Sequence, residues 1–312
     1  MTTTHPRPQT FTADAAPLSS GLRRLDVGSG SALWSLAPYD AQGRPQPAVV
    51  ASLRALLAEP GAGVRRVVLG LEGEPWGSQE ERHRLTRTVL ELLVAHAQVD
   101  LQVHTRTSLV ARDADLLRRL SEKGRATVAF TVASLDERVN AWLEPGAPSA
   151  LRRMMAMQAL AHTGVVVGLR LAPLLPGTLE GCEALLARAA HAGARFVELG
   201  PVGLTPASAQ LLEARASSGA ARPRALRRLH LRTGEAERLR RVVAEKAMAV
   251  GLLPLDAELP VTRSAPAEAP QEVPVAAAVA EARAFGKRRK SVAPRRSSWP
   301  LGPATQLALF AC

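Results

Sequence analysis

The alternation of hydrophobic and polar positions is clearest between residues 126 and 177. Two short runs rich in β-branched and other apolar residues, 126–133 and 165–172, flank a segment with helical periodicity at 149–162. Near-continuous apolar strands on either side of a helix are typical of parallel strands buried on both faces. A right-handed crossover is the expected connection. Ligands bind at the carboxyl ends of such strands, so function is expected in the turns that follow these two runs.

The same alternation extends to both sides of this segment. Further strands are expected at residues 31–37, 64–70, 101–104 and 195–199, and further helices at 49–59, 78–97, 113–123 and 180–192. Ser78 and Glu81 resemble a capping box at the start of the 78–97 helix. About six strand–helix alternations predict a parallel α/β barrel, partial or complete, and an open doubly wound sheet is the alternative.

Composition divides the chain into four regions. We expect a disordered N-terminus at residues 1–30, an α/β partial barrel at 31–215, a basic helical extension at 216–258 and a disordered basic tail at 259–312. No run of eighteen apolar residues is present, and the first 21 residues lack the pattern of a signal peptide. A cytoplasmic protein with no membrane partner is therefore the expectation.

The positive charge lies mainly in the last third of the chain. The formal net charge is +12, and residues 218–312 hold 17 Lys and Arg against 8 Asp and Glu. Clusters of this kind predict sequence-independent contacts with DNA phosphates, and a solvated charged linker is the alternative. The candidate nucleic-acid contacts are Lys287, Arg288, Arg289, Lys290, Arg295 and Arg296.

Several short motifs follow one another along about 140 residues. They are Glu80-Glu81, residues 84–87 and 105–108, Arg112-Asp113, residues 134–136, 143–145 and 147–148, the 172–177 turn and residues 192–194. In order and spacing they resemble the spore-photoproduct-lyase-like branch of the radical SAM superfamily, often called DNA repair photolyases. The resemblance implies a radical-SAM-type partial α/β barrel, in agreement with the strand count.

The resemblance also implies a cofactor whose ligands this chain lacks. The family binds a 4Fe–4S cluster through a CxxxCxxC loop after the first strand, and the cluster binds and cleaves S-adenosylmethionine. The equivalent loop here begins at Leu36 and continues as Ala41-Gln-Gly-Arg-Pro-Gln-Pro47 without a cysteine, while the two cysteines of the chain are Cys182 and Cys312. Gln, Arg and Pro cannot replace three thiolates. We therefore expect no metal site, no catalytic residue and a loss of radical chemistry.

Binding of S-adenosylmethionine without the cluster is the alternative expectation. The family places this ligand across the strand ends, which implies the candidate positions Glu72, Glu74, Thr105, Thr107, Ser134 and Pro173. A carboxylate at these positions would hold an ammonium group or ribose hydroxyls. The competing interpretation is that these residues cap helices and close turns. His104 also lies near a strand end, where its side chain is expected to face the cavity.

The chain ends in a short apolar peptide. Gln306, Leu307, Leu309 and Phe310 resemble the bacterial sliding-clamp-binding pentapeptide, in which a Gln leads to a Leu-Phe pair that fills an apolar pocket. An apolar tail that folds back onto the barrel is the alternative. The predicted function is a non-catalytic DNA repair or maintenance accessory that is recruited to DNA and to the sliding clamp. The alternative is an S-adenosylmethionine-binding barrel enzyme with residual or different lyase-type activity.

Overall fold

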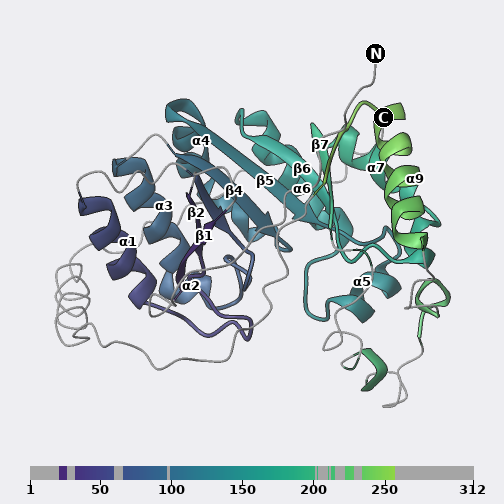
Figure 1. The fold of residues 1–312 in the computed structure, drawn as a ribbon, viewed down its shortest axis with the longest axis horizontal. Helices are drawn as coiled ribbons and strands as arrows, with labels where there is room; N and C mark the ends of the chain where they lie inside the picture. The colour runs from purple at the N-terminus through teal and green to yellow at the C-terminus, as the bar shows by residue number, and fades with distance from the viewer. Residues whose placement is uncertain are drawn as a thin grey trace, which may run out of the picture. The chain divides into compact units, whose positions relative to one another are not determined.

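The described part of the chain forms an eight-stranded sheet in which each strand lies beside its neighbour in sequence (Figure 1). The computed structural model describes residues 21–26, 32–59, 66–96, 99–200, 202, 210, 212–214, 222–227 and 234–256. All of them belong to one compact unit, residues 1–271. Strands β2 to β8 are parallel, and β1 is antiparallel to β2.

The six expected strands are present, and two more strands extend the sheet. The strands are β1 (Leu22–Asp26), β2 (Ala32–Leu36), β3 (Arg66–Leu69), β4 (Asp100–Thr105), β5 (Arg125–Thr131), β6 (Val166–Leu171), β7 (Phe196–Leu199) and β8 (Leu253–Asp256). The sequential strand order excludes a doubly wound sheet, in which the order reverses at a switch point. It is the arrangement of a partial parallel barrel.

Helices connect the parallel strands. They are α1 (Ala48–Ala58), α2 (Glu80–His83), α3 (Leu85–His96), α4 (Ala114–Lys123), α5 (Glu137–Leu143), α6 (Ala150–His162), α7 (Cys182–His191) and α9 (Glu235–Ala249), with 3-10 turns η1 (Leu109–Asp113), η2 (Pro176–Leu179) and η3 (Arg224–Leu226). Among the described helices, none is long and apolar enough to span a bilayer.

Three of these elements, β1, α9 and β8, lie outside the expected bounds of the partial barrel. Strand β1 lies within residues 1–30, which were expected to be a disordered N-terminus. The 216–258 segment supplies α9, which contacts α7, and β8, which pairs with β7. This part of the basic extension therefore continues the α/β alternation and belongs to the sheet.

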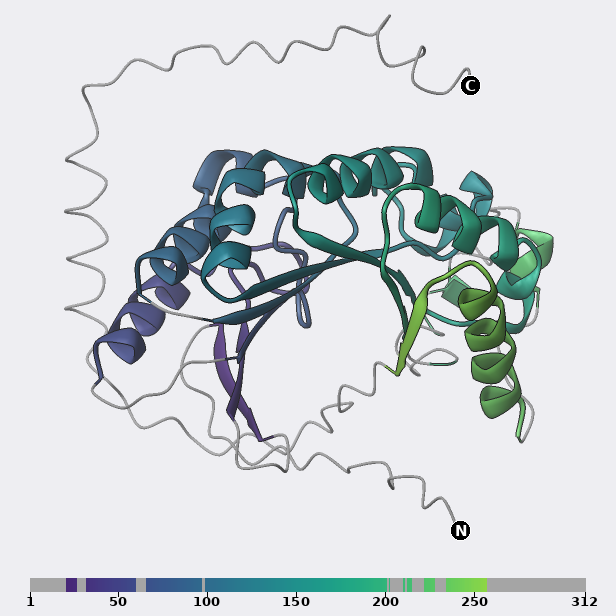
Figure 2. The same cartoon turned by 90° about the horizontal axis from the view of Figure 1, so that it is seen from above.

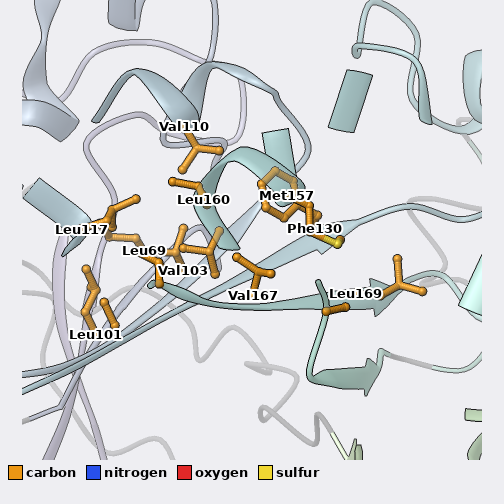
Figure 3. Packing of buried hydrophobic residues seen from close by; sticks show 14 of the residues in the cluster. Leu69, Leu101, Val103, Val110, Leu117, Phe130, Met157, Leu160, Val167 and Leu169 are labelled. Atoms are coloured by element: carbon orange, nitrogen blue, oxygen red, sulfur yellow. The ribbon is translucent and has the colours of Figure 1, made fainter. Parts of the chain in front are cut away.

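The main core lies between the sheet and the helices. Figure 2 shows the strands as a curved sheet with helices along its outer side. Val103 of β4 and Val167 of β6 lie in this core below Leu160 of α6, and Met157 of α6 lies beside Phe130 of β5 (Figure 3). Leu101 of β4 and Leu169 of β6 belong to the same core. Because side chains alternate along a strand, the residues between them point to the opposite, concave face of the sheet.

The single helix expected at residues 78–97 is in fact two helices. Arg84 ends α2 in the left-handed conformation, with φ of 52°, and α3 begins at the next residue. The expected capping box is absent, because Gln79 is the N-cap of α2 and its side chain makes no capping bond. The break turns the first backbone N–H groups of α3 toward the carboxylate of Glu80.

Candidate functional site: the carboxyl edge of the sheet

A buried carboxylate joins the loops that follow β2 and β3. Glu80 is fully buried and accepts hydrogen bonds from the Tyr39 hydroxyl at 2.7 Å and from the backbone N–H groups of Thr86 at 3.0 Å and Arg87 at 3.1 Å. Arg112 adds an ion pair at 2.8 Å. Glu80 thus caps α3 from inside the protein. Burial and the bond to Glu80 raise the pKa of Tyr39 far above its ordinary value.

Asp113 joins the loop after β4 to the same network. Its carboxylate accepts from Arg87 Nη1 at 2.7 Å, Arg112 Nη2 at 2.7 Å and the Trp76 indole N–H at 2.8 Å. Burial alone would raise the pKa of Asp113, but these three donors hold it below its ordinary value. The motifs Glu80-Glu81, residues 84–87 and Arg112-Asp113, which carry the family resemblance, therefore meet in one network that fixes the loops at this edge.

Three of the six candidate ligand positions come together around Glu74. Its Oε1 accepts from the Thr105 hydroxyl at 2.6 Å and its Oε2 from the Arg106 backbone N–H at 2.7 Å. The Thr107 hydroxyl donates to the Trp76 carbonyl at 3.2 Å, and its own N–H donates to Thr105 Oγ1. Burial raises the pKa of Glu74, although these donors oppose the shift. The two threonines and the glutamate fasten the β3 and β4 loops to each other.

The other three candidate positions lie in separate turns on the same edge. Ser134 follows β5 and accepts from the Asp136 N–H at 3.0 Å, while its own N–H and C=O bond to the Asn140 side chain. Pro173 follows β6 after a cis peptide bond with Ala172. Glu72 lies in the loop after β3 and is half-buried. Loop closure accounts for the described contacts of Ser134.

The loop after β2, where the family holds its cluster, is a compact turn. Asp40 accepts from the backbone N–H groups of Gln42 and Arg44, both at 2.9 Å, and from Arg44 Nε at 2.6 Å. Tyr39 is bound to Glu80, so it is not free to bind another group. Cys182, the first residue of α7, is buried in the core, and burial raises the pKa of its thiol to about 11. Within the described ranges, no three His, Cys, Asp or Glu side chains form a metal-binding group.

A second polar cluster, which sequence reasoning missed except for His104, occupies the concave face. His104 on β4 lies 2.9 Å from Glu198 Oε2 on β7, and Arg170 Nη1 on β6 lies 2.7 Å from His104 Nδ1. Gln102 donates to Glu198 Oε1 at 2.7 Å. We call these four residues the concave-face cluster. A polar residue at every second strand position was the available signal, because Gln102 and His104 interrupt apolar runs with the period of a strand.

Known sequences resemble part of this chain. No family model matches the chain. An uncharacterised protein of Mycobacterium tuberculosis is 28% identical over 162 residues, which cover 51% of this chain and 47% of the relative. An uncharacterised protein of Methanocaldococcus jannaschii is 27% identical over 101 residues, 32% of this chain and 37% of that one. The chain thus spans about half the length of the first of these relatives.

Solved structures give the fold directly. A spore photoproduct lyase mutant with bound AdoMet and a dinucleoside spore photoproduct matches with a TM-score of 0.50 and 18% identity, over 66% of this chain and 65% of that chain. A second mutant of the same enzyme matches at 0.50 and 18%, over 67% and 66%. The chain therefore shares the partial-barrel fold of spore photoproduct lyase, which is the fold that the motif order predicts. At this identity the likeness establishes the fold alone.

The candidate contacts in the tail lie outside the described residues. These are the basic residues Lys287, Arg288, Arg289, Lys290, Arg295 and Arg296 and the terminal Gln306, Leu307, Leu309 and Phe310. They remain predictions from the sequence.

Proposed function

We propose that this chain is a radical SAM-fold protein that has lost its iron–sulfur cluster and serves as a non-catalytic accessory in DNA repair or maintenance. The observation that carries the proposal is the loop after β2. It has no cysteine between Ala37 and Pro47, and its backbone is closed by the Asp40–Arg44 bonds. A 4Fe–4S cluster needs thiolate ligands, and the residues here do not fit it.

The two cysteines of the chain do not offer a substitute. Cys182 begins α7 and lies in the hydrophobic core, and its raised pKa keeps the thiol protonated at neutral pH. Cys312 is the last residue in the printed sequence. Two cysteines cannot supply three ligands, even if both were accessible. The fold would then provide a scaffold without the chemistry that the family resemblance implies.

Anaerobic reconstitution with iron and sulfide tests the loss of the cluster. After desalting, we expect substoichiometric iron and no thiolate-to-iron absorbance band. The Cys182→Ser and Cys312→Ser variants should retain the same background iron as the unmodified chain. Iron for one cluster per chain, with a lower iron content in either serine variant, would overturn this part of the proposal.

Recruitment to DNA rests on the charge of the C-terminal third. Residues 218–312 hold 17 Lys and Arg against 8 Asp and Glu, with dense clusters at residues 287–290 and 295–296. Phosphate contacts release counterions, so retention on duplex DNA should fall steeply as salt increases. Replacement of all six clustered basic residues by Gln should reduce both the affinity and the salt slope. Retention that is independent of salt would contradict DNA binding.

Recruitment to the sliding clamp rests on the terminal peptide. Leu309 and Phe310 would fill an apolar pocket, with Gln306 bonded at its edge. We expect the full chain to bind a bacterial clamp and Phe310→Ala to abolish binding. Trp299→Ala, an aromatic truncation in the same tail but outside the peptide, is the matched control. Equal binding by Phe310→Ala and Trp299→Ala would exclude this peptide as the anchor.

The S-adenosylmethionine-binding alternative is less favoured by the contacts of Glu74. Both of its carboxylate oxygens already accept hydrogen bonds from Thr105 and Arg106. A ligand would have to share these oxygens with the bonds that already fasten the loops. Thermal stabilisation by S-adenosylmethionine that Glu74→Gln removes would favour the alternative over the accessory role.

A further inference from the structure

Strand β8 forms one end of the sheet. Among the described strands it pairs with β7 alone, and Figure 2 shows it, in yellow-green, at one end of the curve. An edge strand presents unpaired N–H and C=O groups along its outer side, to which a strand of another chain can bond. Leu253 and Leu255 are 62% and 38% exposed, and a neighbouring strand would cover part of both side chains. Burial of this apolar surface would favour the addition of a strand.

The register of β8 fixes which of its backbone groups point outward. The Leu253 N–H donates to the Arg195 carbonyl, on the side of β7, at 3.1 Å. In a strand, the N–H and C=O groups of successive residues point to opposite sides. Leu253 and Leu255 therefore bond to β7. Pro254 and Asp256 direct their backbone groups to the outer side.

The outer side of β8 lacks most of the donors that a new strand would need. Pro254 has no N–H, and its ring occupies the place of that hydrogen. Leu252, the preceding outward residue, donates its N–H to the Ala247 carbonyl in the last turn of α9 at 2.9 Å. Of the outward residues between 252 and 256, only Asp256 has an N–H to offer. A strand added here would bury carbonyl groups without donors, which costs free energy.

We propose that Pro254 closes the β8 edge against strand addition by a second copy of this chain. Proline is tolerated at this position because the ladder to β7 uses the residues on either side of it. On the inner side of the strand the same residue would remove a hydrogen bond that holds β8 to the sheet. The exposed Leu253 and Leu255 thus lie on an edge that resists self-association. This inference does not depend on the proposed recruitment to DNA or the clamp.

Restoring the missing donor in the full chain tests the proposal. Pro254→Val supplies an outward N–H on a residue type that favours strands. Self-association is measured by analytical ultracentrifugation over a range of concentrations, in salt that screens the net charge of +12. We expect the dissociation constant for self-association to fall at least about tenfold below that of the unmodified chain, because two copies related by a two-fold axis would each regain a hydrogen bond.

Leu253→Val is the matched control on the same strand. It also introduces a strand-favouring residue, but the N–H at position 253 already bonds to Arg195, so association should not change. Hydrogen exchange of dilute Pro254→Val checks the orientation, since the N–H introduced at position 254 should exchange rapidly in the monomer. If Pro254→Val fails to fold, Pro254→Ala supplies the same donor and should also associate more strongly. A folded Pro254 variant that associates no more than Leu253→Val, or whose new N–H is protected in the monomer, would overturn the proposal.

Discussion

At the scale of single residues, Glu80 stabilises three segments with one carboxylate. It caps α3 through two backbone N–H groups and anchors Tyr39 and Arg112. Glu80→Ala would leave these donors buried without a partner. We expect the free energy of unfolding to fall by about 3–5 kcal/mol, the range for breaking a buried ion pair.

Urea denaturation measures this loss, and the neighbouring glutamate supplies the control. Glu81 lies on the same short helix and is exposed. Glu81→Ala should change the free energy of unfolding by no more than about 0.5 kcal/mol. Similar values for the two variants would show that Glu80 has no special role in closing these loops.

At the scale of elements, the break between α2 and α3 depends on the backbone of Arg84. A left-handed conformation costs a residue with a Cβ about 1–2 kcal/mol, and glycine avoids that cost. Arg84→Gly should therefore leave the thermal midpoint unchanged or raise it. Arg82→Gly, an exposed position within α2, should lower the stability by roughly 0.5–1 kcal/mol because glycine weakens a helix. Equal losses in both variants would contradict the assigned break.

The contacts at the carboxyl edge of the sheet explain two observations. The motifs that resemble the family are needed for loop packing, and the candidate ligand-binding residues are already hydrogen-bonded within the protein. Motifs on α2, α3 and η1 converge on Glu80 and Asp113, so their residue types are required for loop packing. Glu74, Thr105 and Thr107 bond mainly to one another and to backbone groups. The interpretation of these residues as turn closures thus accounts for their observed bonds.

At the scale of the whole molecule, the buried carboxylates make stability depend on pH. The pKa of Asp113 is below its ordinary value of 3.8 in the folded state. Its contribution is complete above pH 3.8 and is lost as the pH falls through the lower folded-state value, because protonation then breaks its bonds to Arg87 and Arg112. Acidification should therefore destabilise the protein through this group.

This linkage is tested by comparing the urea midpoint at neutral pH with the midpoint at a pH below the ordinary pKa of Asp. The loss on acidification should be smaller in Asp113→Asn than in the unmodified chain. Asp115→Asn removes a 58% exposed acidic partner of Arg87 and should leave the pH dependence unchanged. An Asp113→Asn variant with the same acid sensitivity as the unmodified chain would exclude Asp113 as a source of it.

The alternation of strands and helices, and with it the fold class, follows from residue types and their spacing along the chain. Short β-branched runs and helical periodicities are local properties, so the strands near Ala126 and Val166 and the helix from Ala150 were all predictable. Strand β1 was missed because Thr/Pro-rich composition dominates the first residues, and β8 because the basic residues of α9 suggested a separate extension. The absence of cysteine ligands from the loop after β2 was also evident from the sequence alone.

Which side chains meet depends on how the elements pack in three dimensions. Glu80 lies 41 positions from Tyr39, and Gln102 lies 96 positions from Glu198, so no local pattern indicates either contact. Parallel strands bring their carboxyl ends to one edge of the sheet. At that edge, the hydrogen bonds show that Glu74 holds the loop after β4. The concave-face cluster exists because a curved sheet and two small residues, Ala129 and Gly168, let three strands present side chains to one another. Such proximity follows from packing in three dimensions and not from order along the chain.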